Sequence, residues 1–216
     1  MSDLRPRRSV LYMPAANERA LDKARTIPAD ALILDLEDAV APDAKDAARA
    51  NACAAASGEY GKREITIRCN ALATPWGTND LLKELRAEAG ANREALVPHL
   101  AAALLGAREA GKVILDGVYN DVRDPDGFLA EAEQGRRLGF DGKTLIHPSQ
   151  VDPANATWAP SAEAIDHAER VIAAFEEAEA EGRGVITVDG RMIENLHVDN
   201  ARRVLATAQA IAELGD

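Results

Sequence analysis

Aromatic residues and cysteines are both scarce in this sequence. Phe, Trp and Tyr make up 4% of its 216 residues, and the two cysteines are Cys53 and Cys69. They match neither a disulfide framework nor a zinc cluster, and no signal peptide is recognisable at the N-terminus. No apolar run approaches the roughly 20 residues that span a bilayer. These absences predict a protein of the reducing cytoplasm that does not cross a membrane.

Basic residues are also fewer than acidic ones. Lys and Arg number 25 against 36 Asp and Glu, which gives a formal net charge of -11 and a pI near 4.9. The resulting field repels phosphate backbones and anionic membrane surfaces, so we expect no nucleic-acid partner. A small anionic substrate would need local cations or a metal to offset this field. Individual arginines are therefore more informative than the total charge.

Several sequence signatures of catalysis are absent, including the zinc-protease His pair, the dinucleotide glycine fingerprint and the nucleophile elbow. The chain instead has a run of apolar residues, 31–34, that leads into three carboxylates, Asp35, Glu37 and Asp38. Such a run is typical of a buried strand in a parallel sheet. Ligands bind beyond the carboxyl ends of these strands, so the carboxylates are candidate site residues. The alternative is a strand end that becomes polar on reaching solvent.

The rest of the chain alternates between strand and helix signals, which indicates a parallel α/β architecture. Helices are expected to begin at caps such as Asn17 and Asp124 and at Pro42, and to end at Gly182. The predicted strands cover residues 9–14, 31–40, 64–70, 112–119 and 139–148. The predicted helices cover residues 17–27, 42–56, 81–88, 93–110, 125–138 and 162–181.

The count of strands is too low for a complete barrel. Five strands are fewer than the eight of a (β/α)₈ barrel, which typically takes about 250 residues. The tail also differs in kind, because residues 184–194 predict a hairpin that turns at Asp189-Gly190 and residues 198–214 predict a terminal helix. We therefore expect a barrel-like domain over residues 1–182 and an extension over residues 183–216.

Two polar residues stand out beyond the acidic strand end. Arg68 closes the third predicted strand, where its guanidinium could hold a substrate carboxylate in bidentate fashion. The structural alternative is an ion pair with Asp35 or Glu37 on the neighbouring strand. Asp80 precedes a helix and could be an oxygen ligand for Mg²⁺, although an isolated aspartate there is more often a helix cap.

Seven motifs, taken together, resemble the HpcH/HpaI aldolase and citrate lyase family, specifically its citrate lyase β-subunit-like branch. They follow the family order across nearly the whole chain. The motifs are RSVLYMP at 8–14, LDLEDAV at 34–40, IRCN at 67–70, GTNDL at 77–81, LDGVYND at 115–121, GFDGKTLIHPSQ at 139–150 and MIE at 192–194.

This resemblance implies a TIM barrel of the phosphoenolpyruvate/pyruvate superfamily that uses Mg²⁺ and assembles as trimers or hexamers. It also implies a lyase that cleaves or forms carbon–carbon bonds in acyl-CoA substrates such as citryl-, malyl- or citramalyl-CoA. Such chemistry removes a hydroxyl proton and stabilises an enolate beside the thioester, while a metal and an arginine hold the distal carboxylate.

The resemblance also assigns roles to individual residues. Asp38, with Glu37 beside it, corresponds to the second-strand acid near the metal, and Asp80 to a metal-ligating carboxylate. The other assignments are substrate binding for Arg68 and Arg8, and an acid–base role for Glu194. In relatives the residue at the Glu194 position is often Asp and reaches into a neighbouring subunit's site, so the longer Glu side chain is a departure.

A larger departure lies near Gly77, which ends one family motif and begins the next. Relatives carry about two and a half further βα units there, at roughly 30 residues each by the usual barrel length. An incomplete barrel is expected. Three functions stay open: a Mg²⁺-dependent acyl-CoA lyase or related thioesterase, a non-catalytic paralogue that keeps a CoA-ester-binding scaffold, and an aldolase acting on free 2-oxo acids.

Overall fold

The chain folds into two compact units, one from Arg7 to Trp158 and the other from Ala159 through the C-terminal segment together with the residues before Arg7. The computed structural model describes residues 5–36, 39–57, 60–68, 85–88, 90, 93–181 and 186–215. None of the described helices is both long and apolar enough to cross a membrane.

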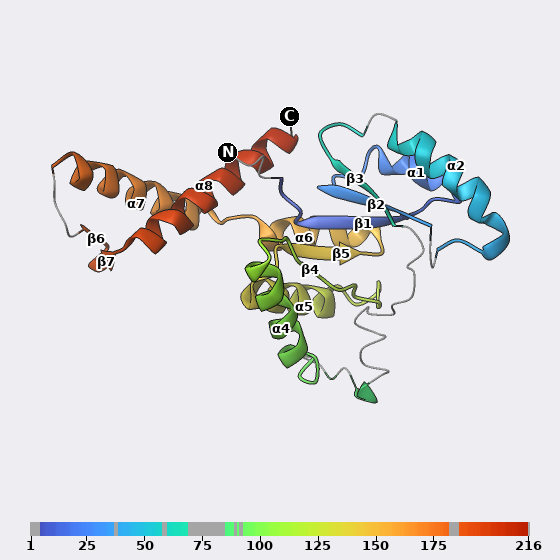
Figure 1. Ribbon diagram of the computed structural model, residues 1–216, viewed down its shortest axis with the longest axis horizontal. Helices are drawn as coiled ribbons and strands as arrows, with labels where there is room; N and C mark the ends of the chain where they lie inside the picture. Colours follow the sequence, from blue (N-terminus) through green and yellow to red (C-terminus); the bar gives the residue numbers. More distant parts are fainter. Residues whose placement is uncertain are drawn as a thin grey trace. The chain divides into compact units, whose positions relative to one another are not determined.

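A five-stranded parallel sheet organises the first unit (Figure 1). Its strands are β1 Ser9–Pro14, β2 Ala31–Asp35, β3 Glu64–Arg68, β4 Leu115–Asp116 and β5 Gly142–Leu145, in the order β3-β2-β1-β5-β4. The first strand thus lies between the second and the last, as in a (β/α)₈ barrel. Between the edge strands β3 and β4, the described residues contain no further strand. The expected parallel α/β fold is confirmed, and the sheet order agrees with a barrel that lacks its central units.

Local signals place the helices of this unit. Asn17 accepts a hydrogen bond from the Ala20 backbone N–H at 3.1 Å, and Asp124 accepts one from the Gly127 N–H at 2.9 Å, so both predicted caps are confirmed. Gly139 follows one helix at a φ of 108°, a conformation that glycine adopts without strain. The helices are α1 Glu18–Ala24, η1 Pro42–Ala44, α2 Lys45–Ala56, α4 Val97–Glu109, α5 Pro125–Leu138, η2 Pro148–Gln150 and α6 Val151–Trp158.

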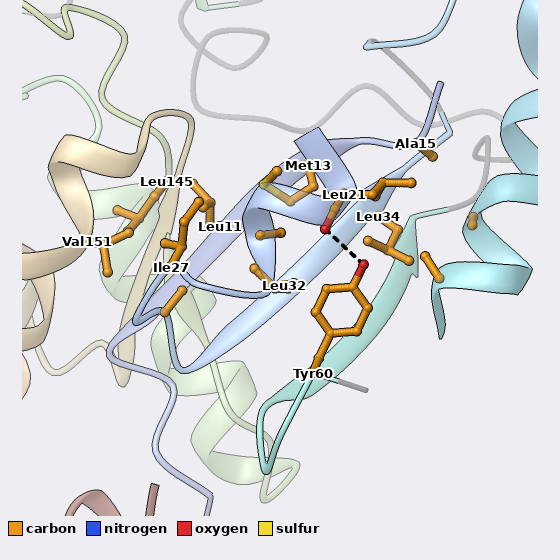
Figure 2. Packing of buried hydrophobic residues seen from close by; sticks show 14 of the residues in the cluster. Leu11, Met13, Ala15, Leu21, Ile27, Leu32, Leu34, Tyr60, Leu145 and Val151 are labelled. Carbon is orange, nitrogen blue, oxygen red and sulfur yellow. Dashed lines mark hydrogen bonds between the residues drawn. The ribbon is translucent and has the colours of Figure 1, made fainter. Parts of the chain in front are cut away.

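The main core lies on the outer face of the sheet, against the helices. Leu11, Leu32, Leu34 and Leu145 have at most 1% of their surface exposed and belong to one apolar cluster (Figure 2). The Tyr60 hydroxyl closes this layer by donating to the Leu21 carbonyl at 3.1 Å. Because side chains of a strand alternate between faces, every second residue of β1 and β2 enters this core.

Arg63, just before β3, forms hydrogen bonds with the end of α1. Its guanidinium donates to the carbonyls of Ala24, Arg25 and Ile27 at 2.7–2.8 Å, and its Nε donates to Tyr60 O at 2.7 Å. These carbonyls follow the last turn of the helix, where backbone acceptors lack intrahelical partners. Burial lowers the pKa of Arg63 from its usual value, although backbone carbonyls accept from four of its five N–H groups.

The second unit is a helical pair with a small hairpin. It contains α7 Ala162–Ala180, β6 Ile186–Val188, β7 Arg191–Ile193 and α8 Asn195–Gly215. The turn between β6 and β7 has positive φ at both Asp189 and Gly190, as predicted for an Asp-Gly hairpin. The expected boundary at residue 183 falls inside this unit, between α7 and β6. Docking of residues 183–216 on a neighbouring subunit stays a prediction.

Candidate functional site

The candidate site lies at the carboxyl edge of β1, β2 and β3. Strand pairing aligns Pro14 with Asp35 and Asp35 with Arg68, which places the last residues of three adjacent strands in one row. The row two residues nearer the amino end holds Tyr12, Ile33 and Thr66. Because alternation puts both rows on the inner face, Arg68 and Tyr12 lie on the same side of the sheet.

Arg68 is held by two neighbours. Its Nη1 lies 3.8 Å from the Asp35 Oδ2, and its guanidinium carbon lies 5.4 Å from the centre of the Tyr12 ring. Asp35 is buried, at 3% exposure, and accepts a hydrogen bond from the Ala39 N–H at 3.2 Å. The ion pair offered as the structural alternative for Arg68 is therefore present. This ion pair positions the planar guanidinium of Arg68, which can donate two hydrogen bonds to a carboxylate. The Arg68 side chain is still 30% exposed.

Below Arg68 the inner face of the sheet borders an open cavity of about 420 Å³. Apolar side chains form most of its walls, with Tyr12 and Thr66 beside them, and the charged side chains lie toward the two ends of the strands. At the amino end Arg7 forms a bidentate pair with Glu64, which raises the pKa of Arg7. The lining residues are Arg7, Val10, Tyr12, Ala31, Ile33, Glu64, Thr66, Ile67, Arg68, Val113 and Leu115.

The predicted acids around the metal are not among the residues that the structure describes. Glu37, Asp38 and Asp80 all lie outside the described ranges. Within those ranges, no three His, Cys, Asp or Glu side chains gather closely enough to hold a metal ion. The described part of the chain thus supplies no complete ligand set for Mg²⁺. The assigned roles of Glu37, Asp38 and Asp80 stay predictions.

Arg8 lies at the opposite end of the sheet from Arg68. It precedes β1, and its Nε and Nη2 donate to the Asp30 carboxylate at 2.8 and 2.6 Å. Arg68 is the last residue of the parallel strand β3. The structure therefore does not bring the two predicted substrate-binding arginines together, and substrate contact by Arg8 stays untested.

Glu194 belongs to the second unit. It is exposed and immediately precedes α8. Its backbone N–H donates to the His197 Nδ1 at 3.0 Å, while its carbonyl accepts from the His197 N–H at 2.9 Å. These contacts fix the backbone at the start of the helix, and the acid–base role of the carboxylate stays a prediction.

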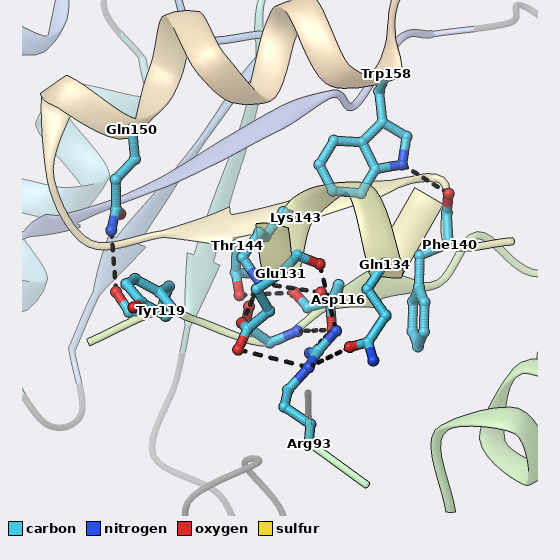
Figure 3. Close-up of polar contacts among 11 residues, drawn as sticks. Arg93, Asp116, Tyr119, Glu131, Gln134, Phe140, Lys143, Thr144, Gln150 and Trp158 are labelled. Atoms are coloured by element: carbon cyan, nitrogen blue, oxygen red, sulfur yellow. Dashed lines mark hydrogen bonds and ion pairs between the residues drawn. The ribbon is translucent and has the colours of Figure 1, made fainter. Parts of the chain in front are cut away.

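A buried ionic cluster under α5 was not anticipated from the sequence. Lys143 is fully buried, and its ammonium donates to Asp116 at 3.0 Å, Gly117 O at 2.6 Å and Glu131 at 2.7 Å (Figure 3). Arg93 donates to the other Asp116 oxygen at 2.8 Å. Two cations thus face two carboxylates, and all three ammonium protons have acceptors. In the sequence, the available signal for this cluster was the presence of Asp116 and Lys143 within two of the family motifs.

Tyr119 and Asp124 form a second unexpected contact, after the carboxyl end of β4. The phenol donates to the Asp124 Oδ2 at 2.6 Å, which raises the pKa of Tyr119 to about 12 and lowers that of Asp124. A Cβ on Gly127 would lie 2.1 Å from this phenol oxygen, so a larger residue there would displace the Tyr119–Asp124 contact. This arrangement joins the chain after β4 to the start of α5.

Comparisons with known proteins give both a matching family and individual relatives. The sequence profile of the HpcH/HpaI aldolase/citrate lyase family matches residues 8–100 and 76–148. A (3S)-malyl-CoA thioesterase of Cereibacter sphaeroides strain KD131 is 41% identical over 274 residues, covering 96% of each chain. The citrate lyase subunit beta of Escherichia coli K12 is 31% identical over 284 residues, covering 95% of this chain and 94% of its own.

One solved structure gives a similar fold. It is CitE from Mycobacterium tuberculosis in complex with magnesium, acetoacetate and coenzyme A, with a TM-score of 0.67 and 25% identity, covering 93% of this chain and 97% of its own. The alignment with the thioesterase runs over 274 residues, more than the 216 of this chain. The relative therefore carries residues without a counterpart here, as the merged motifs at Gly77 predict.

Proposed function

Because this chain belongs to the HpcH/HpaI aldolase/citrate lyase family, we propose that it is a Mg²⁺-dependent lyase acting on 3-hydroxyacyl-CoA thioesters. The substrates would be of the malyl-, citramalyl- or citryl-CoA type. Hydrolysis of the thioester is the related outcome, as named for the Cereibacter sphaeroides relative. The CitE structure with magnesium and coenzyme A supports both the cofactor and the substrate class.

The observation that carries this proposal is the position of Arg68. It lies at the carboxyl edge of the parallel sheet, over the Tyr12 ring and beside the buried Asp35. A guanidinium at that edge can bind the distal carboxylate of the substrate with two parallel hydrogen bonds. Tyr12 and Asp35 restrict its side chain, so less orientational freedom is lost when the substrate binds.

Proton transfer is assigned to acidic residues. Asp38, assisted by Glu37, would take the proton of the substrate hydroxyl. The adjacent carbon–carbon bond then breaks, its electron pair forms the enolate of the acyl thioester, and an acid such as Glu194 returns a proton to that carbon. Bound Mg²⁺ supplies a Lewis acid that stabilises developing negative charge. Asp80 is the residue proposed to hold it.

The decisive experiment is a cleavage assay with (3S)-malyl-CoA and citramalyl-CoA on protein whose intact mass agrees with 23.0 kDa. We expect turnover that needs Mg²⁺ and that falls by about 10²-fold or more in Arg68→Gln, because the bidentate contact is lost. Arg137→Gln, which changes an exposed arginine paired with Glu133, is the matched control. Absence of turnover in mass-verified protein with Mg²⁺ would refute the proposal.

A second candidate function is a non-catalytic scaffold that binds CoA esters. It is favoured by the relative's residues that have no counterpart here. CoA binding without turnover would support it. Condensation of pyruvate with an aldehyde, without any CoA ester, would instead support the aldolase alternative.

We also propose that the protein is a homo-oligomer, a trimer or hexamer, in which residues 183–216 dock on a neighbouring subunit. Met192 and Leu196 flank Glu194 and are 60% and 62% exposed. Large apolar side chains so close together on a surface are typical of an interface. Sedimentation analysis of the double variant Met192→Ser, Leu196→Ser should give smaller assemblies. Leu105→Ser, at an equally exposed leucine of α4, should not.

A further inference from the structure

We infer that the cavity on the inner face of the sheet binds the apolar body of a hydrophobic monocarboxylate, with the ligand's carboxylate at Arg68. Branched or medium-chain acids, and acyl groups of that kind, are the ligand class. The inference rests on the proposed function in one respect, because it takes Arg68 as the group that binds a carboxylate. It goes beyond that function by specifying an apolar acid rather than a small polar one.

The walls of the cavity are apolar along its length. Val10 and Ala31 lie side by side in the strand register, Ile33 lies two residues nearer the carboxyl edge, and Leu115 lies on β4. The Thr66 hydroxyl, on the same face, already donates to the Leu32 carbonyl at 3.2 Å. The middle of the cavity therefore suits a hydrocarbon better than a polar chain.

The incomplete sheet accounts for this space. In a complete (β/α)₈ barrel, side chains from all eight strands fill the interior in layers. Here the described strands form an open sheet with β3 and β4 at its edges. A cavity of about 420 Å³ borders its inner face, within the approximately 300–1,000 Å³ of small-molecule sites.

Charge is distributed unequally between the two ends of the cavity. Arg7 and Glu64 neutralise each other at the amino end. At the carboxyl end the lining contains the Arg68 guanidinium, which pairs with Asp35 at 3.8 Å and keeps 30% of its side chain exposed. The exposed part of this guanidinium can donate two parallel hydrogen bonds to a carboxylate, which orients the ligand with its carboxylate at Arg68 and its apolar part toward Val10.

Calorimetric titration of the full chain with butanoate, hexanoate and octanoate tests the inference. Each buried methylene should tighten Kd by roughly fourfold. Ile33→Trp, which fills the cavity, should abolish this dependence on chain length. Arg68→Gln should weaken all three acids by a similar factor and keep the dependence. Val122→Trp, at an exposed valine outside the lining, is the control, and circular dichroism verifies that each variant is folded.

Two outcomes would overturn the inference. One is a Kd that does not change with chain length. The other is self-association that titrates with protein concentration and is blocked by Ile33→Trp, because a second copy would then occupy the cavity. The titration uses neither a CoA ester nor Mg²⁺, so its failure is distinct from that of the proposed function. If malyl-CoA is turned over but the Kd of the acids does not depend on chain length, only this inference is wrong. If the Kd depends on chain length but malyl-CoA is not turned over, only the lyase proposal is wrong.

Discussion

The two faces of the same sheet differ in how completely they are buried. On the outer face, Leu11, Leu32 and Leu34 are at most 1% exposed. On the inner face Val10 and Ala31, near the amino end, are also buried, but Tyr12 and Ile33, nearer the carboxyl edge, are only half-buried. These side chains alternate along the same two strands, so composition and position in the chain cannot explain the contrast. The difference lies in what covers each face.

Helices cover the outer face, and each helix lies next in the sequence to a strand on which it packs. The outer core is therefore complete wherever a βα unit is present. The inner face of a barrel is covered by the other strands, so it depends on units from distant parts of the chain. Loss of central units leaves the outer core intact and opens the inner face. Stability and ligand binding are thus expected to reside on opposite faces.

The largest effect is expected at the buried ionic cluster on the outer face. Lys143→Met should lower the free energy of unfolding by about 3–5 kcal/mol, because Asp116 and Glu131 would lose a fully buried cation. Denaturant unfolding measures the change, and Lys112→Met at an exposed lysine is the control. A loss below that of the control would show that the cluster contributes no net stability.

Adjacent residues of β2 give a direct comparison of the faces. Leu32→Ala should cost about 3 kcal/mol, because it leaves a cavity in the outer core. Ile33→Ala should cost only about 1 kcal/mol, because its side chain is half-buried beside an existing cavity. Both are measured from the midpoints of denaturant unfolding curves at constant slope. Equal losses would mean that the inner face is as well packed as the outer one.

The sequence predicted much of the fold because its signals are local. The first strand, Ser9–Pro14, and the helix Pro125–Leu138 have the predicted bounds, and the Asp189–Gly190 turn follows directly from its dipeptide. The predicted strand 112–119 is reduced to Leu115–Asp116. An edge strand has one partner, here β5, and the extent of pairing depends on that partner rather than on local sequence.

The site was harder to predict because its contacts join distant residues. The pairing of Arg68 with Asp35 was anticipated as an alternative, since both close strands of one parallel sheet. The Tyr12 ring under Arg68 depends on the register between strands, which one sequence does not reveal. The ion pairs of Lys143 could not be predicted either, because its partners come from two other elements. Short motifs identified the segments but not which side chains meet.

The comparison extends to the two ends of the strands. Arg8 and Asp30 form a bidentate pair at the amino end, with 14% and 2% of their side chains exposed. Arg8→Gln should therefore lower the free energy of unfolding by about 2 kcal/mol, because it leaves the Asp30 charge buried and poorly compensated. Arg68→Gln should cost less than about 1 kcal/mol. A raised KM for a CoA ester in Arg8→Gln, with unchanged stability, would support the substrate-binding role instead.

The smallest effect concerns the hydrogen bond from Tyr119 to Asp124 at the carboxyl end. The pKa of Tyr119 is raised from 10.0 to about 12, so its contribution to stability is present below pH 10.0 and is lost as the pH rises through about 12. The pKa of Asp124 is lowered from 3.8, so its contribution is present above pH 3.8 and is lost as the pH falls below it.

Ultraviolet titration of tyrosinate should therefore show a late phase, near pH 12, that belongs to Tyr119. Tyr119→Phe should remove that late phase, and Tyr12→Phe should keep it. Asp124→Asn is the sharper variant, because an asparagine oxygen can still cap α5 through the Gly127 N–H while the negative charge is lost. It should return the Tyr119 pKa toward 10.0. A late phase that persists in Asp124→Asn would mean that burial, rather than the carboxylate, raises the pKa of this phenol.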